Sequence, residues 1–158
     1  CDSEPPVFVN TVKVQSAKDM YDAVIERADS MDIIVKAAAV ADYRPKNVSS
    51  EKVKKQDGNM SIELERTDDI LKTLGERKNS QFICGFSMET ENMLENSRKK
   101  LEKKNCDMIV ANNLKQDGAG FGGNTNIVTL ITKDDEVQLE KMTKDEVAEK
   151  IFDFILSR

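Results

Sequence analysis

The sequence predicts an α/β fold of the three-layer Rossmann-like kind, in which helices cover both faces of a mostly parallel sheet. Short apolar runs at 32–41, 81–86 and 107–111 have the length and composition of buried strands. Amphipathic segments that begin with helix-capping residues separate these runs. With 158 residues, the chain has the length of one domain. Alternation of strands and helices in one domain is typical of a sheet enclosed between helices.

The first 41 residues predict a strand, a helix and a second strand. Four valines between 7 and 14 form an interrupted strand-like run. Ser16, with Asp19 three residues later, resembles a capping box that opens a helix extending through Arg27. The run 32–41 begins with three β-branched residues and continues with small ones, so we expect a central parallel strand buried on both faces.

Residues 42–66 predict an extended arm that ends in a hairpin. A proline at position 45, paired serines and a basic run are followed by an Asp-Gly-Asn turn signal. Apolar and polar residues then alternate from Met60 to Leu64.

After the arm, the chain returns to alternating helices and strands. We expect Thr67 to cap a helix with Asp68 and Asp69 in its first turn.

The remaining elements are justified by apolar spacing, turn residues and caps. They are a strand at 81–86, a helix at 91–104, a strand at 107–111, a glycine-rich loop at 115–126, an antiparallel pair at 127–132 and 136–139, and a final helix capped by Thr143 and Glu146. In sheets of this kind ligands bind beyond the carboxyl ends of the strands. The loops that follow the strands are therefore the places where we expect a site.

Composition removes several classes of function. The chain has no histidine, which excludes Ser-His-Asp and Cys-His catalysis and histidine-ligated zinc supplied by this chain. Its net charge of -5 argues against nucleic-acid and anionic-membrane partners. No apolar run approaches the ~18 residues that span a bilayer. Cys84 and Cys106 lie in apolar runs, as buried thiols of a cytoplasmic protein would.

Four motifs each admit a functional and a structural interpretation. Asp42 after AAAVA could hold a hydroxyl or a cation, or could only cap a turn. The lysines of EKVKKQ (51–56) suit a phosphate or a solvated strand edge. Lys100 and Lys104 share a helix face, but cations are also favourable near a helix C-terminus. DGAGFGGN (117–124) lacks the spacing of a dinucleotide fingerprint and is weak as a nucleotide signal.

Taken together and in order, several stretches resemble one family. They are AAVADYRP (38–45), EKVKKQ (51–56), TDDIL (67–71), GFSMET (85–90), KKNCDMIVANN (103–113) and FGGNTNIVTLI (121–131). The chain resembles the synthetase part of the bacterial flavoproteins of coenzyme A biosynthesis, the phosphopantothenate–cysteine ligases, from about Val12 to its end. This resemblance implies a Rossmann-like domain that forms a homodimer through the 42–66 arm.

The activity that the resemblance implies joins 4'-phosphopantothenate to cysteine and consumes CTP. The substrate carboxylate attacks the nucleotide to give an acyl-cytidylate and pyrophosphate, and the cysteine amine then displaces CMP. An acyl-phosphate anhydride carries its own leaving group, so Mg²⁺, lysine charge and positioning are expected to suffice without histidine. The preference for CTP over ATP comes from the resemblance to the bacterial branch alone.

The resemblance also implies site residues. The backbone around Ala37, Ala38 and Ala39 would line the nucleotide pocket, and Asp42 would contact the nucleotide and its Mg²⁺. Lys52 resembles the catalytic flap lysine that closes over the acyl-cytidylate. The other residues implied to contact the nucleotide are Asp68, Asp69, Ile70, Leu71, Phe86, Lys100 and Lys104. Asp68 departs from the family, which often has proline at this position.

The family's first βα unit, which holds substrate phosphate, is expected before Val7. The chain starts at Cys1 in an acidic, proline-containing segment, so we expect residues 1–158 to be the C-terminal two-thirds or so of a ligase domain. FMN is expected only in a decarboxylase domain further upstream. Alone, the chain is expected to hold the cytidine half of the site and to be a poor ligase. The alternatives are a non-catalytic nucleotide-binding or dimerisation module and a nucleotide-binding α/β domain of another reaction.

Overall fold

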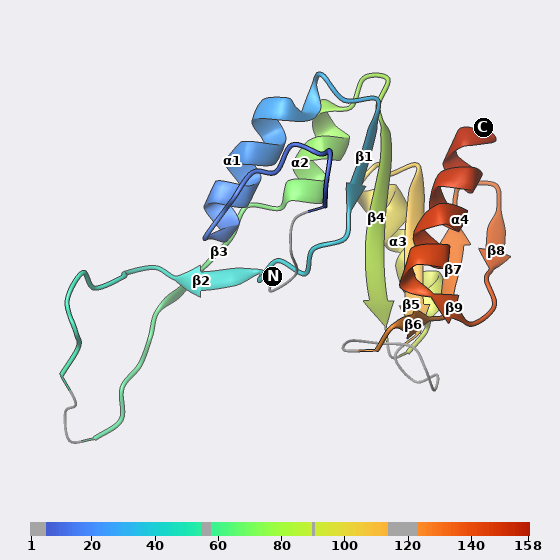
Figure 1. The fold of residues 1–158 in the computed structure, drawn as a ribbon. Helices are drawn as coiled ribbons and strands as arrows, with labels where there is room; N and C mark the ends of the chain where they lie inside the picture. Colours follow the sequence, from blue (N-terminus) through green and yellow to red (C-terminus); the bar gives the residue numbers. More distant parts are fainter. Residues whose placement is uncertain (1–5, 55–57, 90, 114–122) are drawn as a thin grey trace.

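The computed structural model describes residues 6–54, 58–89, 91–113 and 123–158, and it confirms the predicted fold class (Figure 1). A five-stranded sheet has the order β1-β4-β5-β7-β8. The first three strands are parallel, and the last two form an antiparallel hairpin beside β5. The strands of this sheet are β1 (Ile33–Lys36), β4 (Phe82–Glu89), β5 (Met108–Asn113), β7 (Val128–Ile131) and β8 (Glu136–Gln138).

Helices cover both faces of the sheet, as Figure 1 shows. One face carries α1 (Ala17–Ala28), α2 (Ile70–Arg77) and α3 (Met93–Lys103), and the other carries α4 (Lys144–Leu156). Two capping boxes predicted from the sequence are confirmed. The Ser16 hydroxyl accepts from the Asp19 N–H at 3.1 Å, and the Thr143 hydroxyl accepts from the Glu146 N–H at 3.2 Å.

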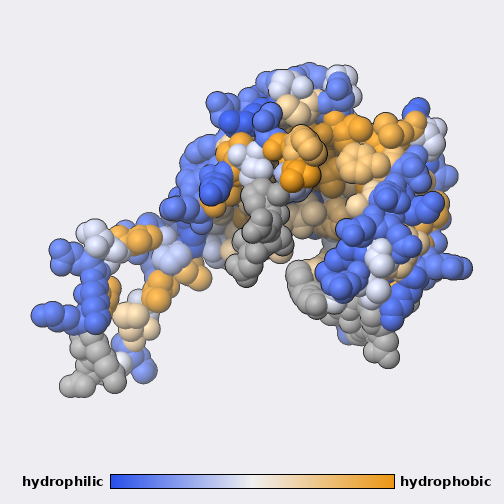
Figure 2. All heavy atoms as spheres, viewed as in Figure 1, coloured by the Kyte–Doolittle hydropathy of each residue, from blue (hydrophilic) through white to orange (hydrophobic). Residues whose placement is uncertain are grey.

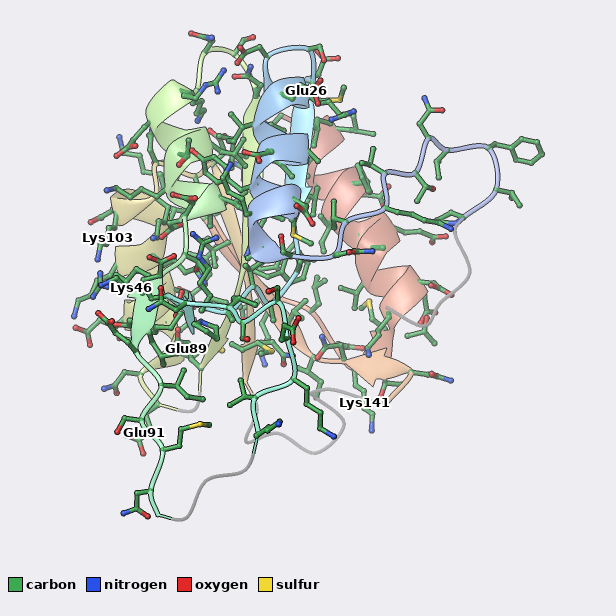
Figure 3. All side chains as sticks on the ribbon, turned by 90° about the vertical axis from the view of Figure 1, so that its left-hand side faces the viewer. Glu26, Lys46, Glu89, Glu91, Lys103 and Lys141 are labelled. Carbon is green, nitrogen blue, oxygen red and sulfur yellow. The ribbon has the colours of Figure 1, made fainter. Side chains whose placement is uncertain are left out.

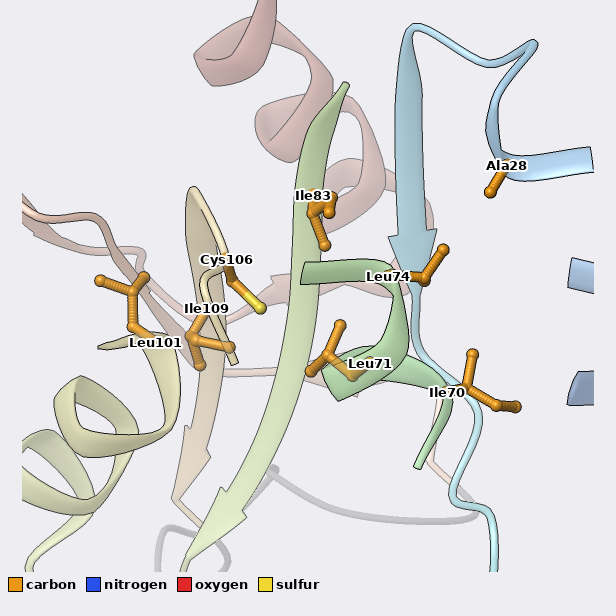
Figure 4. Packing of buried hydrophobic residues seen from close by; sticks show 8 residues of the cluster. All are labelled: Ala28, Ile70, Leu71, Leu74, Ile83, Leu101, Cys106 and Ile109. Carbon is orange, nitrogen blue, oxygen red and sulfur yellow. The ribbon is translucent and has the colours of Figure 1, made fainter. Parts of the chain in front are cut away.

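Alternating strand residues divide the core into two layers. Ile83 and Ile109 point toward α1, α2 and α3, where they pack with residues such as Leu71 (Figure 4). Cys84 and Met108 point toward α4 on the opposite face. A side chain at Gly85 would meet a Leu71 methyl at 2.7 Å, so this glycine allows α2 to pack closely against β4. This packing places the N-terminus of α2 beside the carboxyl ends of the strands.

The predicted arm is present, but its strand pairing lies at the base of the arm, and of the alternating run from Met60 to Leu64 only Leu64 belongs to a strand. β2 (Tyr43–Pro45) pairs antiparallel with β3 (Leu64–Arg66), and the segment between them projects away from the sheet (Figure 1). Two cross-strand ion pairs, Arg44–Glu65 and Lys46–Glu63, each have an N–O distance of 2.7 Å. A further small sheet pairs β6 (Thr125–Asn126) with β9 (Met142–Thr143). Most of the predicted glycine-rich loop lies outside the described residues.

Three predictions about individual elements are wrong. Residues 7–14 form no strand, because Phe8 adopts a left-handed conformation (φ 64°) in a turn and the neighbouring valines are exposed. The run 32–41 contributes only the four residues of β1, which lies at the edge of the described sheet rather than at its centre.

The third wrong prediction concerns the start of α2. Asp69, not Thr67, caps this helix, since its carboxylate accepts from the Lys72 N–H at 3.0 Å. The Thr67 hydroxyl instead donates to the Ala41 carbonyl at 2.6 Å, and its N–H donates to the Asp42 carbonyl at 3.0 Å. Thr67 thus ties the returning arm to the segment that follows β1.

The strands β4 and β5 are longer than predicted. Ser87 to Glu89 continue β4, and Asn112 and Asn113 continue β5, with Ser87 paired to Ala111 and Met88 to Asn112. Residues expected in loops therefore lie in the ladder itself. Cys84 and Cys106 are buried, as predicted, while Cys1 lies outside the described residues. Within the described ranges, the helices all fall short of the length and apolarity that crossing a bilayer requires.

Candidate functional site

A cleft of about 920 Å³ opens at the carboxyl ends of β1, β4 and β5. Its walls come from the N-terminus of α2, one side of α3, the start of α4 and the base of the arm. Eleven of the twelve site residues implied by the resemblance line this cleft: Ala37, Ala38, Ala39, Asp42, Asp68, Asp69, Ile70, Leu71, Phe86, Lys100 and Lys104. They come from segments up to 67 positions apart, so the fold brings together residues that the sequence separates.

The segment after β1 forms one wall through its backbone. Ala37, Ala38 and Ala39 are exposed and carry only methyl side chains, which lets a ligand approach the chain closely. Lys36 donates from Nζ to the Ala38 carbonyl at 2.6 Å. Asp42 follows at the point where the arm leaves the domain, and Thr67 binds the backbone on either side of this point. The position of Asp42 is thus held by contacts 25 residues away in sequence.

The N-terminus of α2 forms a second wall. Asp69 caps the helix, and its carboxylate also forms an ion pair with Lys104, whose side chain is 15% exposed. Burial acts to raise the pKa of the Asp69 carboxyl, but hydrogen bonds from Lys104 and from the Lys72 N–H outweigh burial and hold this pKa below its ordinary value. Asp69 is therefore ionised at neutral pH, and it holds Lys104, the C-cap residue of α3 (Met93–Lys103), against α2.

The helix α3 supplies the lysines of the third wall. Lys100 donates from Nζ to the Phe86 carbonyl at 2.8 Å, and Lys104 lies one turn further along. Their four-residue spacing predicted a shared helix face, and both reach the cleft. Lys103 also lines it, and Figure 3 shows this residue on α3 at the side of the molecule. The cleft is consequently rich in positive charge although the whole chain is acidic.

Lys52 is the one implied site residue that does not line the cleft. It lies in an exposed, extended part of the arm beyond β2. Figure 3, seen from the arm's side, shows Lys46 where the arm leaves the domain, in front of the sheet. In the described conformation the distal arm extends past the cleft, so a role for Lys52 at a bound ligand requires the arm to move or to serve another copy of the chain.

The cleft is also lined by residues outside the implied set, and two of them, Lys36 and Asn112, matter for its chemistry. Lys36 lies at the end of a strand interpreted as wholly buried, and Asn112 lies in a stretch interpreted as a loop. Asn112 is 5% exposed, and its Oδ1 is the one buried side-chain polar atom left without a hydrogen-bond partner in the described part of the chain. Buried polar atoms are normally paired, so this oxygen is available to a ligand donor. A lysine inside an apolar strand was the available signal for Lys36.

The carboxylates do not gather into a metal site of their own. Within the described ranges, no three acidic or cysteine side chains lie close enough together to hold a metal ion. Mg²⁺ commonly binds through one or two carboxylates while substrate phosphates complete its shell. Asp42, at the cleft, is suited to that arrangement, in which the ligand brings most of the coordinating oxygens.

These features define a class of protein: a Rossmann-like α/β domain with a ligand cleft at the carboxyl edge of its parallel strands. Comparison with known families gives a narrower assignment. The model of the DNA/pantothenate metabolism flavoprotein C-terminal domain matches residues 1–158, and the chain belongs to this family. The resemblance seen in the sequence is therefore confirmed.

Individual relatives agree with this family. The coenzyme A biosynthesis bifunctional protein CoaBC of Bacillus subtilis (strain 168) is 53% identical over 131 residues, covering 83% of this chain and 32% of that protein. A cysteine/cysteine sulfinic acid decarboxylase from an unknown prokaryotic organism is 43% identical over 151 residues, covering 94% of this chain and 42% of that protein. The chain thus spans less than half the length of these two curated relatives.

A solved structure shares both fold and sequence. The crystal structure of the C-terminal domain of CoaBC superimposes with a TM-score of 0.79 at 48% identity. The match covers 99% of this chain and 71% of that one. The similarity thus extends over nearly all of this chain, while part of the solved chain has no counterpart in it.

Proposed function

We propose that this chain carries the nucleotide half of a CTP-dependent phosphopantothenate–cysteine ligase of coenzyme A biosynthesis. The observation that carries the proposal is the convergence of eleven implied site residues on one cleft at the carboxyl ends of parallel strands. Its walls combine small side chains for close backbone approach, a helix N-terminus and several lysines. These are features suited to a nucleotide with its phosphates.

The proposed chemistry requires the protein to bind and position the substrates and to stabilise negative charge. The carboxylate of 4'-phosphopantothenate would displace pyrophosphate from CTP, and the amine of cysteine would then displace CMP. Lysine ammonium groups would stabilise the charge that develops on phosphoryl oxygens, and Mg²⁺ held in part by Asp42 would add to this effect. The alternative of a nucleotide-binding module without catalysis shares the first step, the binding of nucleotide in the cleft.

The sheet edge supports the further proposal that these residues form the larger part of a longer domain. β1 has β4 on one side and no ladder partner on the other within the described ranges. Beside it, Figure 2 shows an apolar surface over β1 and β4 next to α4. Val35 on β1 and Phe152 on α4 are large apolar side chains that are exposed. An open parallel edge beside exposed apolar residues is typical of a sheet that receives another βα unit.

The arm supports the proposal of a homodimer. Its apolar residues Val48, Val53, Met60 and Ile62 are 59–83% exposed, because the arm extends away from the rest of the domain (Figure 1). An isolated two-stranded hairpin is marginally stable in water. Packing against the arm or body of a second copy would bury these side chains. In a dimer with a two-fold axis, the apolar residues of both arms would be buried in the same way.

Calorimetric titration of the chain with Mg·CTP tests the proposed function, with Mg·ATP as the comparison. We expect saturable binding that favours CTP and that weakens at least tenfold in Asp42→Ala, because the variant loses a cation ligand and a contact at the cleft. Asp134→Ala removes the same charge from an exposed turn far from the cleft and should bind as the wild type does. Equal binding of CTP by both variants would contradict the role of Asp42, and absence of CTP binding by the wild type would contradict the proposed function.

A further inference from the structure

Lys36 is placed unusually for a lysine. It ends an apolar strand, its side chain is half-buried, and it lines the cleft beside the alanine segment. Its Nζ donates to the Ala38 carbonyl at 2.6 Å. An ammonium group has three donors, so this contact leaves two hydrogens for other acceptors.

Lys36 belongs to a cationic cluster that contains more positive than negative charge. The charged groups that face it are Lys100 from α3, Lys104 from the C-cap of α3, Asp69 from the N-terminus of α2, and Asp42 from the start of the arm. Asp69 is committed to Lys104 by an ion pair. Lys100, like Lys36, donates to a backbone carbonyl, at 2.8 Å. Two ammonium groups that line the cleft from different elements, β1 and α3, thus hold neutral acceptors rather than carboxylates.

We infer that Lys36 is a further ligand-binding residue, whose ammonium group binds, together with that of Lys100, phosphoryl oxygens of the molecule in the cleft. The inference deepens the proposed function and rests on it for the identity of that molecule. Bringing like charges together in a half-buried place costs free energy unless an anion joins them. A polyanion such as a di- or triphosphate supplies several acceptor oxygens and enough charge to offset the cluster.

The electrostatics of the cluster agree with this inference. Burial, followed by the positive charge of Lys100, lowers the pKa of Lys36 from its ordinary value. A bound anion favours the charged form, so it should raise this pKa again. The alternative, in which Lys36 only anchors the Ala38 carbonyl, predicts no response of Lys36 to anions. The two interpretations therefore differ in a measurable quantity.

The test is calorimetric titration of the chain with inorganic pyrophosphate and tripolyphosphate, without divalent cations so that Asp42 contributes nothing through a metal. We expect saturable binding that weakens at least tenfold in Lys36→Met and is largely kept in Lys36→Arg, because a hydrogen bond to a charged group is strong and arginine restores it. Lys99→Met is the matched control: it removes the same charge from an exposed site on α3 that pairs with Glu95. Its binding should equal that of the wild type.

Absence of polyphosphate binding by the wild type, or equal binding by Lys36→Met and the wild type, would overturn the inference. A second measurement does not depend on the folding of any variant. The Lys36 side-chain resonances of the wild type, followed by NMR against pH, should show a higher pKa with saturating pyrophosphate than without it. An unchanged titration would equally overturn the inference.

Titrations with CTP, CMP and 4'-phosphopantothenate then identify the source of the phosphoryl group. A loss for CTP alone in Lys36→Met assigns the lysine to the triphosphate chain, whereas a loss for phosphopantothenate assigns it to the phosphorylated acid. Polyphosphate binding that depends on Lys36, without any binding of CTP, would support this inference while contradicting the proposed function. CTP binding of equal affinity in Lys36→Met and the wild type would support the proposed function while contradicting this inference.

Discussion

Single side chains in this domain take their properties from their place in the fold. Asp107 is an example, since one carboxylate oxygen pairs with Lys78 while the other accepts from the Ile83 N–H at 2.7 Å. Asp69 combines a helix cap with an ion pair in the same way. The two buried cysteines show the opposite case, in which the environment suppresses reactivity. Burial raises the pKa of Cys84 to about 12 and that of Cys106 to about 11.

The buried thiols are expected to be inert in the native state. With a pKa of about 11, roughly one Cys106 thiol in a thousand is ionised at pH 8, and only the thiolate attacks a disulfide reagent. In a Cys1→Ser background, DTNB absorbance at pH 8 should therefore rise only at the rate of unfolding, and at once in urea. Fast release of two equivalents from the native protein would show that the thiols are not buried as described.

At the scale of elements, helix placement depends on close approach at a few positions. Gly75 in α2 lies against the end of α3, and the Asn105 side chain donates to the Gly75 carbonyl at 2.8 Å. Asn105 itself adopts a left-handed conformation (φ 50°) just after α3, a backbone conformation that asparagine tolerates. This contact sets the distance between α2 and α3, and with it the distance between Asp69 and Lys104 at the cleft.

Gly75→Ala is expected to destabilise the domain even though alanine favours helices. An added Cβ would lie 1.8 Å from the Lys104 carbonyl oxygen, so the backbone of one helix must move. Helix propensity alone would predict a gain of about 1 kcal/mol, whereas overpacking of this kind costs about 1–3 kcal/mol. Urea denaturation measures the net effect. The control Glu76→Ala, at an exposed neighbour, should change the free energy of unfolding by less than about 0.5 kcal/mol.

At the scale of the molecule, two surfaces are exposed that other described residues do not cover. One is the outer edge of β1 with the adjoining apolar surface, and the other is the arm (Figures 1 and 2). Because the arm carries exposed apolar residues on an extended hairpin, its stability depends on what it contacts. The proposals of a longer domain and of a homodimer address these two regions separately, and they can be tested separately.

The proposed dimer predicts a concentration-dependent association that the arm controls. Sedimentation equilibrium of the chain should show a dimer, and the double variant Met60→Asp, Ile62→Asp should shift the equilibrium to monomer because carboxylates would enter an apolar interface. Leu156→Asp makes the same kind of change at an exposed residue at the end of α4, outside the arm, and should leave the dimer intact. A monomeric wild type, or a dimer unaffected by the arm variant, would contradict the proposal.

Features that depend on neighbours within one turn could be predicted from the sequence. The caps at Ser16 and Thr143 and the shared face of Lys100 and Lys104 rest on contacts over a few residues, and all are present. The arm was predicted as well, but its ladder joins Tyr43–Pro45 to Leu64–Arg66 at its base, a pairing that the turn signal did not locate. The strand order could not be predicted in this way. Phe8 turns the chain where alternating valines predicted a strand, and β1 lies at an edge although its composition is that of a central strand.

The candidate site divides along the same line. The family resemblance located eleven of its lining residues, but only the fold brings them together in one cleft. Elements far apart in the chain also create the ion pair of Asp69 with Lys104, the unpaired Asn112 oxygen and the charge around Lys36. Local patterns specify helices and turns because their interactions close over three or four residues. Contacts between segments depend on how whole elements pack, and that packing is where the cleft and its charge originate.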